Sequence, residues 1–266
     1  MTIPFIVEPE ELHAHLRDPH LRIIDLCNPQ HYAEGHVPGA LHVLPQELVA
    51  GTPPAPGKLS SVARLNELFS RLGLNANTHF VVYDDEGGGW AGRFIWTLDV
   101  IGHQHYSYLN GGLWAWRAAN LPLSTDAPAI EATAVSVQIN SKPMLDKAAI
   151  LARLGTENFA IWDARSREEY LGLRNTAAKN GHIPGAVHCE WTELMDRNAD
   201  LRIRDDARQY LHNKGFNEQQ TIVTHCQTHH RSGFTYLVGK ALGLRIKAYP
   251  GSWSEWGNSS DTPVEN

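Results

Sequence analysis

Residues 221–234 read TIVTHCQTHHRSGF, a pattern that predicts a short strand, a tight loop and the start of a helix. Ile222 and Val223 are β-branched and apolar, as a buried strand requires. Apolar residues recur at helical spacing from Phe234 onward. Residues 226–231 are therefore expected to curl around the N-terminus of a helix, with Cys226 at the carboxyl end of the strand.

A loop in this position is a favourable place for an anion. The first turn of a helix carries backbone N–H groups without helical partners, and the helix dipole favours negative charge there. A thiol in such a nest loses its proton more easily, and the thiolate is the nucleophile. His229, His230 and Arg231 are expected to add donors and positive potential. We therefore interpret Cys226 as a nucleophile that receives an anionic substrate, rather than as an inert buried cysteine.

The spacing within the loop separates two chemistries. Four residues lie between Cys226 and Arg231, one fewer than in the wider, phosphate-cradling loop of cysteine-dependent phosphatases. The run from Cys226 to Ser232 resembles the active-site loop of the rhodaneses, most closely that of the bacterial thiosulfate sulfurtransferases. The resemblance covers essentially the whole chain. It implies an α/β fold of two tandem rhodanese-like domains, each a mostly parallel sheet flanked by helices on both faces, and a cysteine that carries sulfur as a persulfide.

An internal duplication organises the chain. The hexapeptide GHVPGA at 35–40 recurs as GHIPGA at 181–186, and residues 80–83 correspond to 221–224. Short apolar strands, such as 3–7 and 22–26, alternate with helical patterns, which favours parallel sheets. We predict one domain at 1–125, a linker with the first strand of the second domain at 126–140, and a catalytic domain at 141–266. His36 and His182, within the repeated hexapeptides, are interpreted as structural.

The first copy is predicted to be catalytically silent. The repeat assigns Asp85 to the position of Cys226, and the loop at 84–90 reads DDEGGGW, with three acids and no thiol. The resemblance implies the same, since tandem rhodaneses usually keep the second copy active. Residues 87–92 also fit the Gly-x-Gly-x-x-Gly pattern of dinucleotide-binding loops. Three acids directly before it are unfavourable for a pyrophosphate, so we do not expect nucleotide binding.

Two further arginines are candidates for the substrate pocket. Arg165 follows a predicted strand, and Arg174 lies nine residues further on. Two arginines at the carboxyl edge of a sheet could bind an oxyanion bidentately, or they could be ordinary surface residues. The resemblance implies that both positions line the pocket. Trp191 is interpreted as core packing, with an apolar wall of the site as the alternative.

The cysteines and histidines of the chain are not expected to bind a metal ion. His225, Cys226, His229 and His230 are ligand types that suit zinc, but adjacent histidines on one tight loop cannot easily converge on one ion. Cys27 and Cys189 are most simply buried small hydrophobes.

Composition sets the broad class. The 266 residues are 42% hydrophobic and 20% charged, with net charge −6, which argues against nucleic-acid or membrane partners. The charge is uneven, at −5 for residues 1–125 and −1 for residues 126–266. Three widely spaced cysteines do not form a disulfide framework, and residues 1–7 lack the basic region of a signal peptide. We expect a cytoplasmic protein.

These patterns lead to an enzymatic hypothesis. Cys226 takes the outer sulfur of thiosulfate as a persulfide and passes it to cyanide or another thiophilic acceptor, without a cofactor. The alternatives are a 3-mercaptopyruvate sulfurtransferase, whose loop is small and little charged, and a carrier that delivers sulfur to a protein acceptor. The residues expected to bind substrate are Gln227, Thr228, His229, His230, Arg231 and Ser232, together with Arg165 and Arg174.

Overall fold

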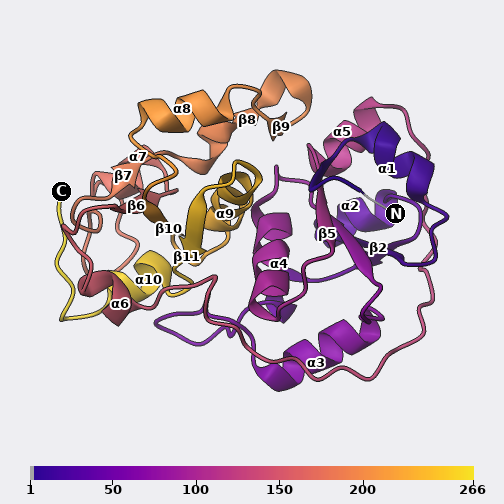
Figure 1. Cartoon of the computed structure of the whole chain (residues 1–266), viewed down its shortest axis with the longest axis horizontal. Helices are drawn as coiled ribbons and strands as arrows, with labels where there is room; N and C mark the ends of the chain where they lie inside the picture. The colour runs from indigo at the N-terminus through magenta and orange to yellow at the C-terminus, as the bar shows by residue number, and fades with distance from the viewer. Residues whose placement is uncertain (1–2) are drawn as a thin grey trace.

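The computed structural model describes residues 3–266, which form two parallel sheets side by side (Figure 1). The N-terminal sheet has the order β1-β5-β4-β2-β3 and the C-terminal sheet the order β11-β10-β6-β7, while β8 and β9 form a separate antiparallel pair. The strands are β1 (Ile6–Val7), β2 (Leu21–Asp25), β3 (Ala40–His42), β4 (His79–Tyr83), β5 (Tyr106–Leu109), β6 (Phe159–Asp163), β7 (Val187–His188), β8 (Met195–Asp196), β9 (Arg202–Ile203), β10 (Thr221–His225) and β11 (Arg245–Ala248).

Helices connect the parallel strands, as crossover connections require. The α-helices are α1 (Pro9–His15), α2 (Pro29–Glu34), α3 (Val62–Arg71), α4 (Gly89–Val100), α5 (Gly112–Ala118), α6 (Lys147–Leu151), α7 (Arg167–Tyr170), α8 (Ala207–Asn213), α9 (Arg231–Ala241) and α10 (Ser252–Trp256). The 3-10 turns are η1 (Pro45–Glu47), η2 (Trp191–Leu194) and η3 (Arg197–Ala199).

Each sheet is covered on both faces. In the N-terminal half, Leu12 of α1 and Trp116 of α5 pack against one face, and α3 and α4 pack against the other. In the C-terminal half, Trp253 of α10 covers one face and Leu237 of α9 covers the other. The predicted fold class, two α/β domains with parallel sheets between helices, is confirmed.

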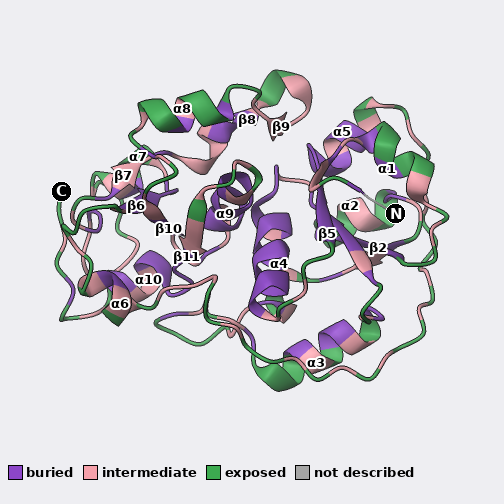
Figure 2. Ribbon diagram, viewed as in Figure 1, coloured by how far each residue is buried: buried purple, intermediate pink, exposed green. Residues whose placement is uncertain are grey.

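The two halves share one apolar core. α4 and α9 lie side by side at the centre, and both are largely buried (Figure 2). A Cβ added at Gly92 would come within 2.2 Å of the carbonyl oxygen of Gly233, so only glycine permits this backbone approach. A single cluster of buried side chains runs from α3 and α4 through α9 to α8. The helix that follows each repeated loop therefore forms the domain interface.

Residues 126–140 differ from the prediction, because this range contains no strand. Val137 donates its amide to Asn66 on α3, and Val135 and Val137 pack against the shared core. These two valines are therefore covered without pairing in the second sheet. The counterpart of β1 is a single parallel bridge from Met144 to Ala248. The predicted strand at 3–7 is likewise shorter, at Ile6–Val7.

The repeated hexapeptides tie down the end of each half. His36 stacks on Tyr32 at 3.9 Å and forms an isolated antiparallel bridge with Ser124. His182 stacks on a tyrosine at 3.8 Å and bridges to Glu265 in the same way. Both histidines are buried, in agreement with the structural role predicted for them.

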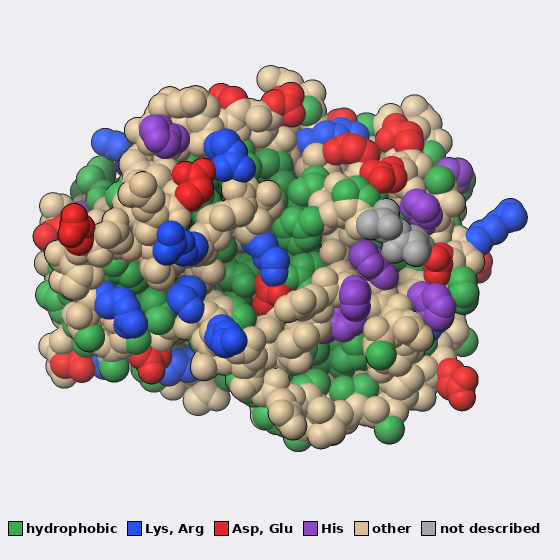
Figure 3. All heavy atoms as spheres, viewed as in Figure 1, with side chains coloured by type: hydrophobic (Ala, Val, Ile, Leu, Met, Phe, Trp, Pro, Cys, Tyr) green, Lys and Arg blue, Asp and Glu red, His purple; other side chains and the backbone are tan. Residues whose placement is uncertain are grey.

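The surface reflects the uneven charge of the sequence. In Figure 3 most Lys and Arg side chains on the visible face lie over the C-terminal half, which carries 16 of the 23 basic residues. Within residues 3–266 no helix has the length and apolar character needed to cross a membrane.

Candidate active site

Cys226 lies directly after β10, in the loop that leads into α9, as the sequence predicts. The strand before it is central in its sheet, paired with β6 on one side and β11 on the other. The thiol is buried at 1% exposure, and the Cys226 carbonyl accepts the amide of Trp253 at 2.9 Å. The loop is thereby held rigidly at the carboxyl edge of the sheet, where ligands bind in open α/β sheets.

The surroundings of the thiol favour its charged form. Burial raises the pKa of Cys226, but the charge of Arg231 and hydrogen bonds from Ser232 offset it, and the net pKa is lowered from 9.0. The Ser232 hydroxyl donates to Sγ at 3.5 Å. The other two thiols behave in the opposite way, since burial raises the pKa of Cys189 to about 12 and that of Cys27 further. Cys226 is therefore the best thiolate in the chain.

Arg231 is held by a partner that the sequence analysis missed. Its guanidinium forms a two-pronged ion pair with Glu169, with Nη1–Oε2 at 2.6 Å and Nη2–Oε1 at 2.9 Å. Glu169 is buried and also accepts the amide of Ser166, completing the capping box of α7. The Ser-x-x-Glu spacing was a readable signal for this role. Arg231 therefore has a fixed position and contributes charge beside Cys226.

His230 is held from the N-terminal half. Its Nε2 forms an ion pair with the Glu86 carboxylate, and its ring stacks on Trp90 at 4.4 Å. Trp191 lies on another side at 5.7 Å, so this residue borders the loop rather than packing only in the core. Burial lowers the pKa of His230, but Glu86 and the Cys226 charge outweigh it and raise the pKa above 6.5. The ion pair with Glu86 therefore favours the positively charged form of His230.

His229 does not provide the positive potential predicted for it. The residue is fully buried with φ of +57°, and its ring meets Trp96 edge-on at 4.7 Å. Burial, with the Arg93 charge second, places its pKa well below 6.5, so the ring is neutral. Nδ1 lies 2.8 Å from the Ser232 hydroxyl. Because that hydroxyl donates to Cys226, His229 donates from Nδ1 and acts on the thiol only through Ser232.

The middle of the loop is braced by its neighbours. Gln227 donates to the carbonyl of Thr176 at 3.0 Å. Gly57, from the N-terminal half, packs so closely that an added Cβ would lie 2.0 Å from the Thr228 carbonyl oxygen. Arg93 of α4 donates to the carbonyls of Gly57 at 2.7 Å and His229 at 3.5 Å. This buried arginine, which no local sequence pattern indicated, fastens the loop to the other half.

In the corresponding N-terminal loop, an aspartate side chain occupies the anion-binding nest of backbone amides. Parallel pairing places Tyr83 opposite Asp25 and His225 opposite Asp163, so Asp84, not Asp85, is the counterpart of Cys226. The Asp84 carboxylate accepts the amides of Glu86, Gly87, Gly88 and Ala91 at 2.8–3.1 Å. In the C-terminal loop the amides of Thr228, His229 and His230 donate to no protein acceptor within residues 3–266. The C-terminal nest alone is therefore available to an external anion.

The structure does not place the two distant arginines in the loop. Arg165 is fully buried and pairs with Asp163, with Nη2–Oδ2 at 2.5 Å, while its guanidinium lies 4.3 Å from the Trp253 ring. Its Nη1 is buried and has no hydrogen-bond partner within residues 3–266. Arg174 is exposed and influences Glu168 rather than Cys226. Substrate binding by Arg165 and Arg174 therefore stays a prediction.

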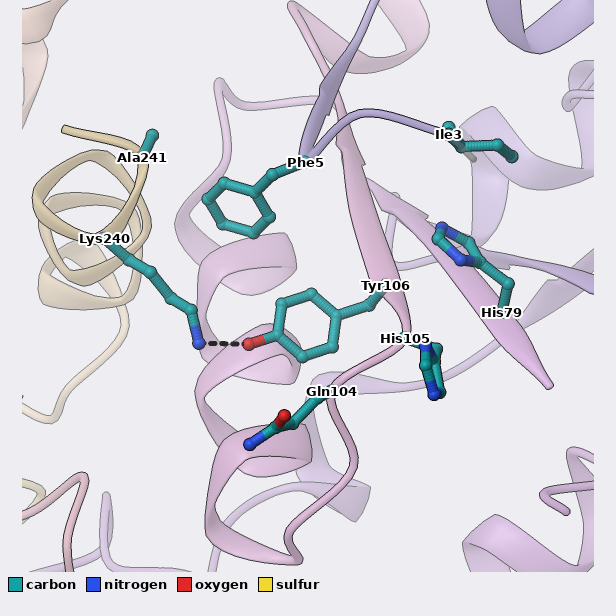
Figure 4. A pocket seen from close by; sticks show the side chains of 8 residues that line it. All are labelled: Ile3, Phe5, His79, Gln104, His105, Tyr106, Lys240 and Ala241. Carbon is teal, nitrogen blue, oxygen red and sulfur yellow. Dashed lines mark hydrogen bonds between the residues drawn. The ribbon is translucent and has the colours of Figure 1, made fainter. Parts of the chain in front are cut away.

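Other features of the described residues lie outside this loop. A hollow of about 660 Å³ is lined by residues of both halves, and there Lys240 donates to the Tyr106 hydroxyl (Figure 4). Lys240 lies near the far end of α9 from Arg231, roughly 13–14 Å away along the helix axis.

Among residues 3–266 no three His, Cys, Asp or Glu side chains are arranged to hold a metal ion.

Known proteins share this architecture. A profile of the rhodanese-like domain matches residues 8–119 and again residues 146–259. This chain belongs to the rhodanese family. It is 53% identical over 265 residues to a protein from Azotobacter vinelandii named thiosulfate sulfurtransferase, covering 99% of this chain and 98% of the relative. A protein of the same name from Pseudomonas aeruginosa is 51% identical over 264 residues, covering 99% and 97%.

A solved structure of the rhodanese family is similar throughout. The crystal structure of SseA from Escherichia coli, a 3-mercaptopyruvate sulfotransferase, is 26% identical with a TM-score of 0.79. The match covers 95% of this chain and 99% of that one. The tandem α/β fold expected from the resemblance is therefore that of a characterised rhodanese.

Proposed function

We propose that this chain is a thiosulfate sulfurtransferase that works through a persulfide on Cys226. The observation that carries the proposal is the thiol itself, which has a lowered pKa and lies in a loop whose amides lack protein acceptors. Two cations, Arg231 and His230, lie beside it. A nucleophilic sulfur and an anion-binding loop in one place suit an anionic sulfur donor.

The cycle has two displacements. The Cys226 thiolate attacks the outer sulfur of thiosulfate, a sulfur–sulfur bond forms, and the bond to the sulfite group breaks with its electron pair. Sulfite leaves as a dianion while the loop amides and the cations stabilise its charge. Cyanide or another thiophile then attacks the outer persulfide sulfur, and the thiolate is regenerated. The charges balance at each step, and the proposed cycle needs no cofactor.

The character of the loop supports thiosulfate over mercaptopyruvate as the donor. A loop with two fixed cations, His230 and Arg231, favours a dianion over a donor with one carboxylate. The high identity to relatives named thiosulfate sulfurtransferase supports the same choice. We propose that the acceptor is a small thiophile or a protein thiol and that the reaction takes place in the cytoplasm, where the three free cysteines would stay reduced.

Steady-state kinetics with both donors test the proposal. Wild-type protein should form thiocyanate from thiosulfate and cyanide with a higher kcat/KM than from mercaptopyruvate. Cys226→Ser should abolish thiocyanate formation, and Cys27→Ser and Cys189→Ser should keep most of it. Wild-type preference for mercaptopyruvate would overturn the donor assignment. Stoichiometric sulfite release without turnover on cyanide would favour the carrier alternative.

A further inference from the structure

The two repeated loops touch each other at the domain interface. Glu86 belongs to the loop before α4, and His230 belongs to the loop before α9, yet the carboxylate and the imidazole form an ion pair. They lie 144 residues apart in the sequence. The side chain of Glu86 is 32% exposed and that of His230 is 23% exposed, so the pair lies at the rim of the loop rather than deep in the core.

The surroundings of this pair are shaped to hold one orientation of the imidazole. Trp90 stacks on one face of the His230 ring at an interplanar angle of 23°. A Cβ added at Gly89 would lie 2.6 Å from Nε2 of His230 and 2.7 Å from Oε1 of Glu86, so the glycine makes room for the contact. Trp191 of η2 borders the ring from the C-terminal half. The imidazole therefore has its rotation restricted from both halves.

The charges that face His230 come from both loops. Glu86 and Asp84 approach from the loop before α4, and the Cys226 sulfur from its own loop, and all three favour the imidazolium. η2 presents the neutral ring of Trp191. Arg231, the next residue along the loop, is held in its own ion pair with Glu169. Burial lowers the pKa of His230, and the Glu86 ion pair is the largest influence that opposes it.

We propose that Glu86 is a positioning residue for sulfur transfer at Cys226, acting through His230. Its carboxylate holds the imidazolium against Trp90, beside the sulfur, where the charge of departing sulfite develops. The domain without a thiol thereby contributes to the reaction of the other domain and helps to select a dianionic donor. This inference rests on the proposed function of Cys226.

The test compares Glu86→Gln with wild type across pH. The neutral amide keeps the size of the side chain but no longer favours the imidazolium, so the pKa of His230 should fall. A downward shift of one pKa unit would reduce kcat/KM for thiosulfate by up to about tenfold at pH values above the pKa of both proteins. The two proteins should converge at pH values below both pKa values, where each keeps the imidazolium. A ring-nitrogen NMR titration, with the His230 signal assigned by its absence in His230→Gln, measures the pKa without catalysis.

Two matched variants serve as controls. Asp85→Asn removes the same charge from the neighbouring residue, which pairs with His31 inside the N-terminal half, and Glu67→Gln removes an exposed charge on α3. Both should leave the His230 titration unchanged, and Glu67→Gln should also leave activity unchanged. Glu86→Asp, which keeps the charge, should retain more of the pH 8 activity than Glu86→Gln. Adding Glu86→Gln to His230→Gln should change the pH profile no further.

The outcomes separate this inference from the proposed function. If wild type acquires no sulfur from thiosulfate, the proposed function fails. If wild type acquires sulfur but Glu86→Gln leaves the His230 titration and the pH profile unchanged, the positioning role is wrong. An equal loss of activity at every pH, with an unchanged titration, would also overturn it, because it would show a purely structural effect.

Discussion

Arg231 and Glu169 form a two-pronged ion pair, with nitrogen–oxygen distances of 2.6 and 2.9 Å, that joins the start of α9 to the capping box of α7. Their side chains are 20% and 6% exposed. The guanidinium next to Cys226 is thus oriented by a carboxylate on a separate connection of the sheet. A change at Glu169 should therefore act on the catalytic loop without touching the thiol.

The first prediction concerns Glu169→Gln. The variant leaves a mostly buried guanidinium without its counter-charge and should lower the free energy of unfolding by about 1–3 kcal/mol at pH 7. The pKa of Glu169 is raised by burial but lowered overall by Arg231, so it lies below 4.5. The pair should therefore stabilise the fold above pH 4.5, and the difference from wild type should shrink as pH falls through the lowered pKa. Urea unfolding at several pH values measures it. Glu168→Gln, its exposed neighbour, should show little change.

The second prediction concerns the order in which thiols react. The pKa of Cys226 is below 9.0, that of Cys189 is about 12, and that of Cys27 is higher still. Because the thiolate is the reactive form, Cys226 should be alkylated by iodoacetamide first as pH rises. Peptide mass mapping after short exposures at pH 6–9 measures the order. Faster modification of Cys189 at neutral pH would contradict the electrostatics described for the loop.

The third prediction concerns the filled nest of the N-terminal loop. Asp84→Ala removes an acceptor for four amides, three of them in buried hydrogen bonds, and should lower the free energy of unfolding by about 2–4 kcal/mol. Asp84→Asn keeps one carbonyl acceptor and should cost less. Asp84→Cys should not create a second active site, because the counterparts of Arg231 and Ser232 are Gly89 and Trp90. Persulfide formation at this new thiol, measured in a Cys226→Ser background, would contradict that expectation.

The fourth prediction separates the two histidines of the loop. His230→Gln removes a cation and should reduce kcat/KM for thiosulfate by roughly 10-fold, about 1.4 kcal/mol of transition-state stabilisation, with a smaller loss for mercaptopyruvate. His229→Gln alters a neutral, buried ring that supports Ser232 and should reduce activity with both donors alike. Steady-state kinetics at one ionic strength measure both, since salt screens the partly exposed charge of His230. If His229→Gln lost more activity with thiosulfate than with mercaptopyruvate, His229 would carry positive charge as well. That result would refute the assignment of the charge to His230 and not to His229.

Local patterns account for what the sequence could predict. The strand, loop and helix around Cys226 follow from the apolar run before the thiol and the helical spacing after it, and the repeat predicted two parallel sheets. The repeat aligned Asp85 with Cys226, one residue too far along the chain. The N-terminal loop has no thiol to align, and only the pairing of Tyr83 with Asp25 in the structure fixes the correspondence. The strand predicted within residues 126–140 is absent because apolar residues such as Val135 and Val137 can be buried against the shared core without pairing in a sheet.

The site was less predictable because much of it is assembled from distant parts of the chain. Glu86 and Arg93 reach the loop across the domain interface, over sequence separations of 144 and 136 residues. No pattern along the chain specifies such contacts. The sequence also does not show which of two adjacent histidines is buried. In the structure the backbone directs His229 into the domain interface and His230 toward the rim of the loop. Arg165 follows a strand as predicted, but its ion pair with Asp163 was not specified by the sequence.

The most direct test of the account is the intact mass of the protein after treatment with thiosulfate and removal of excess reagent. We predict a gain of about 32 Da, one sulfur atom, located on the peptide that contains Cys226 and lost on addition of cyanide. Cys226→Ser should show no gain. A persulfide on Cys27 or Cys189, or the same gain in Cys226→Ser, would contradict the assignment of Cys226 as the residue that carries sulfur.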